Sequence, residues 1–443
     1  MSKIVLIGAN HAGTAAANTI LDNYPGNELV IFDSNNNISY LGCGTALYIG
    51  GQINDTGGLF YSSKDKLAAK KAVVHMETEV KRIDFDGKKV TAAGKDGEIV
   101  EGYDKLIIAT GSLPIQPKIK GLDTPGVEYV KFFQDGQKIH ELLGRSEIKT
   151  AAVVGAGYIG VELAEAVRRR GKEALLFEAE STSLASYYDD WFTKDMDKNL
   201  ADHGVKLHFG ELVQEIEGDG KVTGVVTNKG KYPADIVIMA IGFRPNSALA
   251  KDSLETLPNG AYKVNLKQET SKPGVYAIGD CASVYSNALE NSAYIALATN
   301  AVRSGVVAGH NACGTALESA GVQGSNGICI WDYKMVSTGL NMKAAEKAAF
   351  SPVYTQFEDL QKPAFVTENN HKVKIRIVYD KNTRRVLGAQ MASYQDISMG
   401  IHMFSLAIEE KVTIDKLKLL DIFFLPHFNQ PYNYITMAAL TAK

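Results

Sequence analysis

The strongest constraint on the fold is a pattern that the chain shows twice. A short apolar run leads into a glycine-rich turn, a helical stretch and a second apolar run that ends in an acidic residue. The first copy runs from KIVLIG at 3–8 to Asp33, and the second from AAVVG at 151–155 to Glu178. Short β-branched runs that end in glycine are typical of buried parallel strands. Two such βαβ units predict an α/β protein with two Rossmann-like dinucleotide-binding domains.

The second unit carries a complete G-x-G-x-x-G motif, formed by Gly155, Gly157 and Gly160. The motif follows a strand and opens a helix, and Glu178 ends the next strand about 20 residues further on, as a dinucleotide fingerprint requires. The glycines let backbone N–H groups approach a pyrophosphate, and the carboxylate accepts hydrogen bonds from a ribose diol. No Lys or Arg occurs at 179–181. Because a 2′-phosphate would meet negative charge there, the motif favours NADH over NADPH.

The first unit has a degenerate version of this motif, with Gly8, Asn10 and Gly13. Asparagine replaces the middle glycine, but the strand, the turn, the helix and the terminal Asp33 are all present. We therefore expect a second nucleotide site, on the weaker of the two motifs.

Two later segments support this first site. LIIATGS at 106–112 and GVYAIGDCA at 274–282 resemble the ATG and GD motifs of FAD-binding proteins with two dinucleotide folds. Asp280 would accept a hydrogen bond from the ribityl chain of FAD. Since the four motifs occur in the right order, we expect FAD in the first unit and NADH in the second.

Cys43 is the cysteine whose position suggests chemistry. It directly follows the first βαβ unit, in SYLGCGTALY at 39–48, where the chain should pass the flavin. Glutathione-reductase-like flavoproteins have a second cysteine five residues later, whereas this chain has Tyr48. A single thiol can cycle through sulfenic acid, form a mixed disulfide with a small thiol, or merely pack. We expect a helix that begins after Cys43 to lower the pKa of its thiol.

Composition excludes several classes of protein. Lys and Arg number 47 against 50 Asp and Glu, a net charge of −3, so the chain has no global basic field for nucleic acid or an anionic membrane. The four scattered cysteines, with no CxxC pair, indicate neither a disulfide framework nor a structural zinc site. No apolar stretch approaches the roughly 18 residues of a membrane helix, and no signal peptide is evident. We therefore expect a cytoplasmic protein that binds no metal, nucleic acid or membrane.

With these motifs in order, the sequence resembles the single-cysteine branch of the flavoprotein disulfide reductases over essentially its full length. This branch includes NADH oxidases, NADH peroxidases and coenzyme A-disulfide reductases. Within it, the chain looks most like the water-forming NADH oxidases of lactic acid bacteria. The segments that carry this resemblance are NHAG at 10–13, YLGCGTALY at 40–48, YIALATNAVRSG at 294–305 and FFLPHFNQPYNY at 423–434.

The resemblance implies an FAD domain that is split in sequence, an inserted NADH domain and a C-terminal α+β domain that forms a homodimer or a dimer of dimers. The expected boundaries are 1–115 for the first part of the FAD domain, 116–245 for the NADH domain, 246–320 for the second FAD part and 321–443 for the dimerisation domain. The Pro- and Gly-rich stretch at 113–130 is expected to be a linker, with a second crossing near 242–249.

Within the last segment, KVKIRIVYDKNTRRVLGAQMAS at 372–393 predicts a β-hairpin with its turn at 380–383. DISMGIHMFSLAIEEK at 396–411 has helical spacing. No glycine-rich turn recurs there, so this domain is expected to be of a different type.

The resemblance also assigns site residues. Cys43 would be the redox cysteine and His11 its neighbour near the flavin, with His427 as a second candidate histidine. Tyr158 and Ile159 would lie over the nicotinamide, and Phe424 would reach the site from the other subunit. The residues expected to bind the cofactors are Gly8, Asn10, His11, Ala12, Gly13, Asp33, Cys43, Val80, Ala109, Thr110, Gly111, Ser112, Lys131, Gly155, Gly157, Tyr158, Ile159, Gly160, Glu162, Glu178, Tyr187, Gly242, Gly279, Asp280, Leu297, Ala298, Thr299, Gly327 and Phe424.

The activity implied is an FAD-dependent oxidase that uses two NADH to reduce dioxygen to water, with a role in oxygen detoxification. Reduced FAD would form a C4a-hydroperoxide with dioxygen, the Cys43 thiolate would take the distal oxygen and become sulfenic acid, and His11 would act as a general acid. NADH peroxidase and coenzyme A-disulfide reductase stay open as alternatives, although coenzyme A-disulfide reductases generally lack a histidine at position 11. A membrane quinone reductase would need an amphipathic C-terminal anchor, and a non-catalytic redox sensor would need a damaged site.

Overall fold

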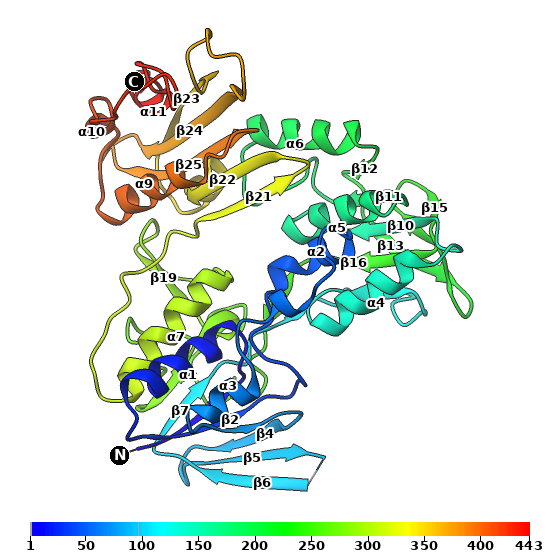
Figure 1. Ribbon diagram of the computed structural model, residues 1–443, viewed down its shortest axis with the longest axis vertical. Coiled ribbons are helices and arrows are strands. Elements are labelled where there is room, and N and C mark those ends of the chain that lie inside the picture. The colour runs from blue at the N-terminus through cyan, green and yellow to red at the C-terminus, as the bar shows by residue number, and fades with distance from the viewer. Residues whose placement is uncertain (1, 96) are drawn as a thin grey trace.

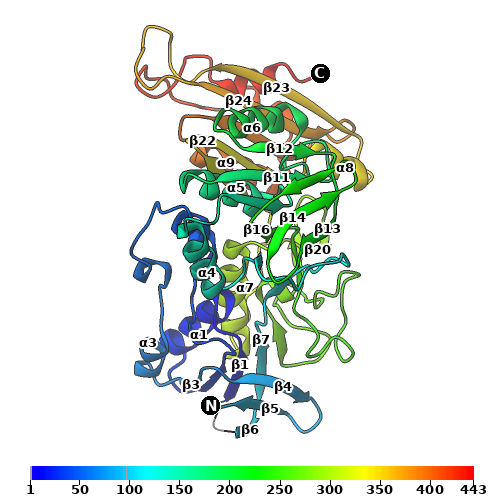
Figure 2. The same cartoon turned by 90° about the vertical axis from the view of Figure 1, so that its right-hand side faces the viewer.

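The computed structural model describes residues 2–95 and 97–443 (Figure 1). Three five-stranded sheets and their helices form three parts, which follow one another along the long axis of the molecule (Figure 2). Two of the sheets are parallel and the third is antiparallel, which confirms the predicted α/β fold with two Rossmann-like units and a C-terminal α+β domain.

The first parallel sheet lies at the N-terminal end of the molecule. Its strands, in order, are β18 (Val275–Ala277), β7 (Lys105–Ile108), β1 (Lys3–Ile7), β2 (Glu28–Phe32) and β3 (Val73–His75). Ile4 and Leu6 of β1 pack on helices α1 (His11–Asn23) and α7 (Ala298–Ala312). Val5 and Ile7 face the opposite side, toward an antiparallel sheet of β4 (Glu79–Asp84), β5 (Lys89–Gly94) and β6 (Gly97–Gly102). Because both faces are covered, the strand is apolar at every position.

The second parallel sheet repeats this plan. Its strands are β12 (Lys206–Phe209), β11 (Glu173–Glu178), β10 (Thr150–Val154), β16 (Ile236–Met239) and β9 (Val127–Tyr129). Helices α4 (Phe133–Gly144), α5 (Tyr158–Arg169) and α6 (Asp190–Asp202) contribute to the core on one face. A small sheet of β13 (Val213–Gly218), β14 (Val222–Thr227) and β15 (Lys231–Pro233) covers the other.

The C-terminal sheet is antiparallel. Its strands are β21 (Asn326–Ile330), β22 (Tyr333–Gly339), β25 (Val386–Ser393), β24 (Lys372–Asp380) and β23 (Pro352–Leu360). Its helices are α8 (Met342–Lys347), α9 (Ser398–Glu409), α10 (Ile414–Leu417) and α11 (Tyr434–Leu440). The pairing of β24 with β25 confirms the predicted hairpin, and α9 confirms the predicted helix.

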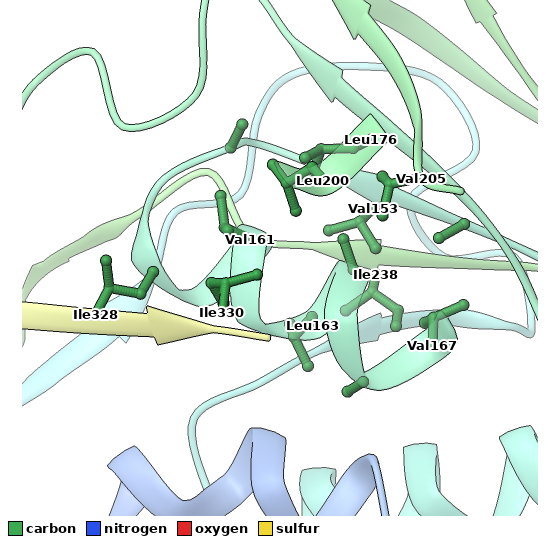
Figure 3. Close-up of a cluster of buried hydrophobic side chains, with 14 of the residues drawn as sticks. Val153, Val161, Leu163, Val167, Leu176, Leu200, Val205, Ile238, Ile328 and Ile330 are labelled. Atoms are coloured by element: carbon green, nitrogen blue, oxygen red, sulfur yellow. The ribbon is translucent and has the colours of Figure 1, made fainter. Parts of the chain in front are cut away.

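The C-terminal sheet shares a core with the second parallel sheet. Ile328 and Ile330 of β21 lie among the side chains of α5 and β10, as Figure 3 shows. This packing fixes the C-terminal domain against the helix that follows the second glycine motif.

The segments expected to cross between the domains are partly ordered as strands. β8 (Ser112–Pro114) pairs antiparallel with β17 (Phe243–Pro245), so the outgoing and returning chains lie side by side. The stretch 113–130, expected to be only a linker, also supplies β9 to the edge of the second sheet. Short elements complete the fold: η1 (Gly42–Gly44), α2 (Thr45–Ile49), η2 (Gly57–Leu59), α3 (Lys64–Ala69), η3 (Gly279–Cys281), β19 (Val284–Ser286) and β20 (Asn291–Ala293). Among the described residues, none of the helices is long and apolar enough to cross a membrane.

Candidate active site

A single large cavity, of about 1820 Å³, joins the two glycine turns. Its walls come from both parallel sheets and from the C-terminal domain, which supplies Asn326 and Ser337. Most of the predicted cofactor residues line this cavity. They are Gly8, Asn10, His11, Ala12, Asp33, Cys43, Val80, Ala109, Thr110, Gly111, Ser112, Lys131, Gly155, Gly157, Tyr158, Ile159, Glu162, Glu178, Tyr187, Gly242, Gly279, Asp280, Leu297, Ala298 and Gly327.

The two turns have the same hydrogen-bond pattern. The Ala9 N–H donates to Asp33 Oδ2 at 2.7 Å, and the Ala156 N–H donates to Glu178 Oε2 at 2.8 Å. Each acidic residue therefore holds its own glycine turn in place. A carboxylate oxygen has two lone pairs, so each can still accept a hydrogen bond from a ribose hydroxyl.

Gly13 and Gly160 do not line the cavity, and their role in the structure is packing. A Cβ at Gly13 would lie 1.9 Å from the Gly8 carbonyl oxygen, and one at Gly160 would lie 1.8 Å from that of Gly155. The third glycine of each motif thus lets the helix begin directly against the strand.

The helices that follow these turns fit phosphate groups. Neither α1 nor α5 has a side-chain N-cap hydrogen bond or an acidic residue in its first turn. Their first N–H groups lack partners within the helix and carry the positive end of the helix dipole. Together with Asp33 and Glu178, these two N-termini give the cavity the donors and acceptors that FAD and NADH need.

Asp280 lies in a small polar cluster on the cavity wall. The Ser112 hydroxyl donates to Asp280 Oδ2 at 2.8 Å, and Lys131 Nζ donates to the Ser112 oxygen at 2.7 Å. Lys131 Nζ lies 3.6 Å from the Asp280 carboxylate and 4.8 Å from the centre of the Phe243 ring. The structure therefore places Lys131 beside the residue expected to bind the ribityl chain.

Cys43 lies in η1, two residues before the start of α2, and its side chain is exposed toward the cavity. Although the side chain reaches the open cavity, the surrounding walls partly desolvate the Cys43 thiol and so raise its pKa, and the charges of Glu162 and Asp280 raise it further. The expectation that a following helix would lower this pKa is wrong. With five residues, α2 is too short for its dipole to offset desolvation and two nearby carboxylates.

His11 opens α1 and contacts Tyr61. Its Nδ1 lies 3.0 Å from the Tyr61 hydroxyl, and the two rings are stacked with centroids 5.8 Å apart. Burial lowers the pKa of His11, and burial raises that of Tyr61 to about 12. In the neutral tautomer whose Nδ1 accepts a hydrogen bond from the Tyr61 hydroxyl, His11 carries its proton on Nε2.

Tyr158 is anchored both by a residue of the C-terminal domain and by tyrosines of its own unit. Its hydroxyl hydrogen-bonds Asn326 Oδ1 and, at 2.9 Å, the Tyr188 hydroxyl. Its ring meets the Tyr187 ring edge-on with centroids 4.5 Å apart. The residue expected over the nicotinamide thus has a position fixed from two domains.

Thr299 and Phe424 also lie outside the cavity wall that the described residues form. Thr299 is the second residue of α7. Phe424 lies in the segment between α10 and α11, where it and His427 are exposed. Because Phe424 is expected to act in the other subunit, its role stays a prediction.

Sequence reasoning missed Tyr61 and Asn326. Tyr61 lies 50 residues from His11 in the chain, and no motif surrounds it. Asn326 belongs to a domain that has no nucleotide motif. In both cases the contact arises from tertiary packing, and a local pattern carries no signal for it.

Comparison with known families and proteins gives a consistent result. Residues 2–305 match the family described as pyridine nucleotide-disulphide oxidoreductase, and residues 326–433 match the dimerisation domain of that family. The chain is 58% identical to an NADH oxidase of Lactococcus lactis subsp. cremoris and 56% identical to one of Streptococcus pyogenes, with all of each chain covered.

A solved structure is similar over the whole fold. The water-forming NADH oxidase from Lactobacillus brevis, bound to NADH, superposes with a TM-score of 0.96 at 37% identity. The match covers 99% of this chain and 98% of that one.

Proposed function

Because the chain belongs to the pyridine nucleotide-disulphide oxidoreductase family, we propose that it is an FAD-dependent oxidase that uses two NADH to reduce one dioxygen to two waters. The observation that carries this proposal is the cavity itself, in which both nucleotide turns, Cys43 and His11 share one space. The Lactobacillus brevis structure, water-forming and bound to NADH, supports both the product and the electron donor.

Several residues would bind and orient the two nucleotides. Asp33 and Asp280 would hold FAD at its adenosine ribose and its ribityl chain, while Glu178 would hold the ribose of NADH. FAD held by these residues would supply a hydride acceptor for NADH and a two-electron donor for dioxygen. Tyr158, held by Asn326 and Tyr188, would limit where the nicotinamide lies.

Cys43 would then decide which product leaves. Its sulfur attacks one oxygen of the peroxide, an S–O bond forms, the O–O bond breaks, and the sulfur gives up two electrons to become sulfenic acid as one water departs. Two electrons from the second NADH, with two protons, reduce the sulfenic acid to thiol and release the second water. In the tautomer whose Nδ1 accepts from the Tyr61 hydroxyl, His11 would donate its Nε2–H to the reacting oxygen.

The experiment that tests this function is oxygen uptake by the purified FAD-loaded protein with limiting NADH, followed by addition of catalase. Two NADH per dioxygen, with no oxygen returned by catalase, is the expected result. One NADH per dioxygen, with half the oxygen returned, would mean that peroxide escapes and would overturn water formation. Negligible uptake would overturn the oxidase proposal in favour of peroxide or a disulfide as the acceptor.

We also propose that the chain assembles as a homodimer through its C-terminal domain. The match of residues 326–433 to the dimerisation domain supports this, and so do the large exposed apolar side chains in the segment between α10 and α11.

A further inference from the structure

The first turn of helix α4 connects the second parallel-sheet unit to the cavity wall of the first. In Figure 2, α4 lies between α1 of the first unit and α5 of the second. The helix belongs to the second unit, because its Ile139 and Leu143 are part of that core. The two residues just before it, Lys131 and Phe132, nevertheless line the cavity that joins the two glycine turns. A segment of one unit therefore lies beside the nucleotide expected in the other.

Gln134, the second residue of α4, crosses to the loop that follows strand β2. Its Nε2 lies 2.7 Å from Asn35 Oδ1 and 2.8 Å from Asn36 Oδ1. The Asn36 N–H also donates to Asn35 Oδ1, at 2.8 Å, so that atom is the oxygen and Gln134 presents its amide nitrogen to it. One side chain of the second unit thus donates to two neighbouring side chains of the first.

The loop that Gln134 contacts follows the residue expected to bind the adenosine ribose of FAD. The Asn35 N–H donates to Asp33 Oδ1 at 2.8 Å, while the other carboxylate oxygen accepts from the Ala9 N–H of the glycine turn. Asp33 and Asn35 line the cavity, whereas Asn36 lies outside its wall. Because the contacts lead from Gln134 through Asn35 to Asp33, helix α4 helps to fix the position of this carboxylate.

Contacts on two sides hold the start of α4 in place. The N–H groups of the two residues before the helix donate to Asp135 Oδ2 at 3.0 and 2.7 Å, which fixes the turn into the helix. On the other side, the Phe133 ring packs near the rings of Tyr40 and Phe60, with centroids 5.5 and 5.1 Å away. Gln134 therefore extends from a fixed support toward the loop.

Lys131 makes a similar contact at the other end of the expected FAD position. Its Nζ donates to Ser112 and lies 3.6 Å from the carboxylate of Asp280, the residue expected to bind the ribityl chain. Since Lys131 and Gln134 are three residues apart, one short segment contacts the surroundings of both Asp280 and Asp33. The segment is thus placed to lie along the FAD between them.

We propose that Gln134 is a positioning residue of the FAD site, which holds the loop of residues 34–37 in place and thereby slows the release of FAD. Residues 131–134 form a segment that we call the α4 strap. The strap retains FAD, although it belongs to the unit expected to bind NADH. This proposal rests on the proposed placement of FAD between Asp33 and Asp280, and it adds a residue that lies in neither nucleotide motif.

The hydrogen bonds of Gln134 set the size of the expected effect. For FAD to leave, the loop of residues 34–37 must move away from the adenosine, and this movement breaks both hydrogen bonds to Gln134. Without them, Asn35 Oδ1 and Asn36 Oδ1 keep their contacts within the loop alone. The loss of two neutral hydrogen bonds corresponds to a change of about 10-fold in the rate of release.

The test measures FAD exchange in the purified holoenzyme, without NADH. Holoenzyme is incubated with excess isotope-labelled FAD and desalted at intervals, and the labelled fraction of the bound FAD is determined by mass spectrometry. For Gln134→Leu, which keeps the size of the side chain but removes its amide, we expect exchange about 10-fold faster than in the wild type. Equal rates for Gln134→Leu and the wild type would overturn the proposal.

Gln137→Leu is the matched control. It makes the same substitution three residues further along α4, at an exposed side chain, and should exchange FAD at the wild-type rate. Acceleration by Gln137→Leu to the level of Gln134→Leu would show that any such change in α4 releases FAD, and the role of Gln134 would be lost.

A variant of lower stability distinguishes positioning from a general weakening of the fold. Leu200 of α6 is fully buried and lies outside the cavity wall, so Leu200→Ala should lower the Tm by leaving a void in the core. We expect Gln134→Leu to exchange FAD faster than Leu200→Ala does, although its Tm is the higher of the two. Exchange rates that simply follow the Tm of the variants would overturn the proposal.

A combined variant tests whether Gln134 acts through the loop. Asn35→Ala with Asn36→Ala removes both side-chain acceptors, so adding Gln134→Leu to this pair should leave the exchange rate unchanged. A further 10-fold acceleration would mean that Gln134 acts elsewhere. The exchange is independent of the product of oxygen reduction: peroxide release in the oxygen-uptake experiment would overturn the proposed function alone, and a normal exchange rate in Gln134→Leu would overturn the positioning role alone.

Discussion

In the proposed cycle, Cys43 determines whether water or hydrogen peroxide is released, since its thiol would consume peroxide before the peroxide leaves the cavity. We predict that Cys43→Ser still oxidises NADH but uses one NADH per dioxygen and releases hydrogen peroxide, because a hydroxyl cannot form a sulfenic acid. A peroxide assay alongside NADH consumption measures this. Complete conversion to water by the variant would remove Cys43 from the cycle.

At the scale of single residues, the sequence predicted which side chains line the cavity better than it predicted their chemistry. Cys43, Asp33 and Glu178 were identified from motifs, because their spacing from a glycine turn fixes where they lie. The raised pKa of Cys43 was not foreseen, since it depends first on desolvation by the surrounding walls and then on the charges of Glu162 and Asp280, which come from two distant parts of the chain. The Tyr61 partner of His11 was missed for the same reason.

At the scale of the βαβ element, Glu178 is both a support for the glycine turn and the expected ribose contact. We predict that Glu178→Ala raises the KM for NADH about 10-fold or more, with a smaller effect on NADPH, because only the 2′-hydroxyl of NADH benefits from the carboxylate. Steady-state kinetics with both nucleotides measures this. An unchanged ratio of the two KM values would exclude Glu178 as the ribose contact.

A substitution at Gly160 tests how helix α5 of the same βαβ element packs against its strand. We predict that Gly160→Ala lowers the free energy of unfolding by about 1–3 kcal/mol or more, because the new methyl group would lie 1.8 Å from the Gly155 carbonyl oxygen and helix α5 must shift. Thermal unfolding of the FAD-loaded protein gives the change in Tm. Gly26→Ala is the matched control, since a Cβ there meets nothing within 4 Å; equal Tm values for the two variants would contradict the prediction.

The βαβ elements were predictable because each is fixed by local signals: a buried strand, a glycine turn and an acidic residue at the next strand end. The short strands between the domains were not predictable in this way. Residues 127–129 form an edge strand of the second sheet only because β16 lies beside them, and residues 112–114 pair with 243–245 across a long separation in sequence. Short strands of this kind carry no periodicity of their own.

At the scale of the whole molecule, the C-terminal domain is coupled to the second Rossmann-like unit by buried polar groups as well as by the apolar core. Arg376 of β24 lies 3.0 Å from Asp189, just before α6, and both side chains are largely buried. Gln390 of β25 donates to the same Asp189 carboxylate at 2.9 Å. Since Asn326 also anchors Tyr158, the C-terminal domain helps to shape the end of the cavity that is expected to hold the nicotinamide.

The last prediction concerns the surface of the C-terminal domain. Leu419, Phe423, Phe428 and Tyr432 are 89%, 66%, 56% and 75% exposed in the single chain, a concentration of apolar surface that water disfavours. A symmetric dimer would bury it and would bring Phe424 of each chain toward the other. We predict that Leu419→Asp combined with Phe428→Asp shifts the protein from dimer to monomer in analytical ultracentrifugation, because each interface would then contain four buried, unpaired carboxylates.

Val100→Asp is the control for this prediction. Val100 lies on β6, at the opposite end of the molecule in Figure 1, and is 58% exposed. Val100→Asp places one of the same carboxylates at an exposed apolar position without touching the C-terminal domain, so this variant should sediment as the wild type does. If the double variant stays dimeric, the segment between α10 and α11 is not the interface. If it becomes monomeric and retains water formation, Phe424 of the partner subunit is not needed for the chemistry.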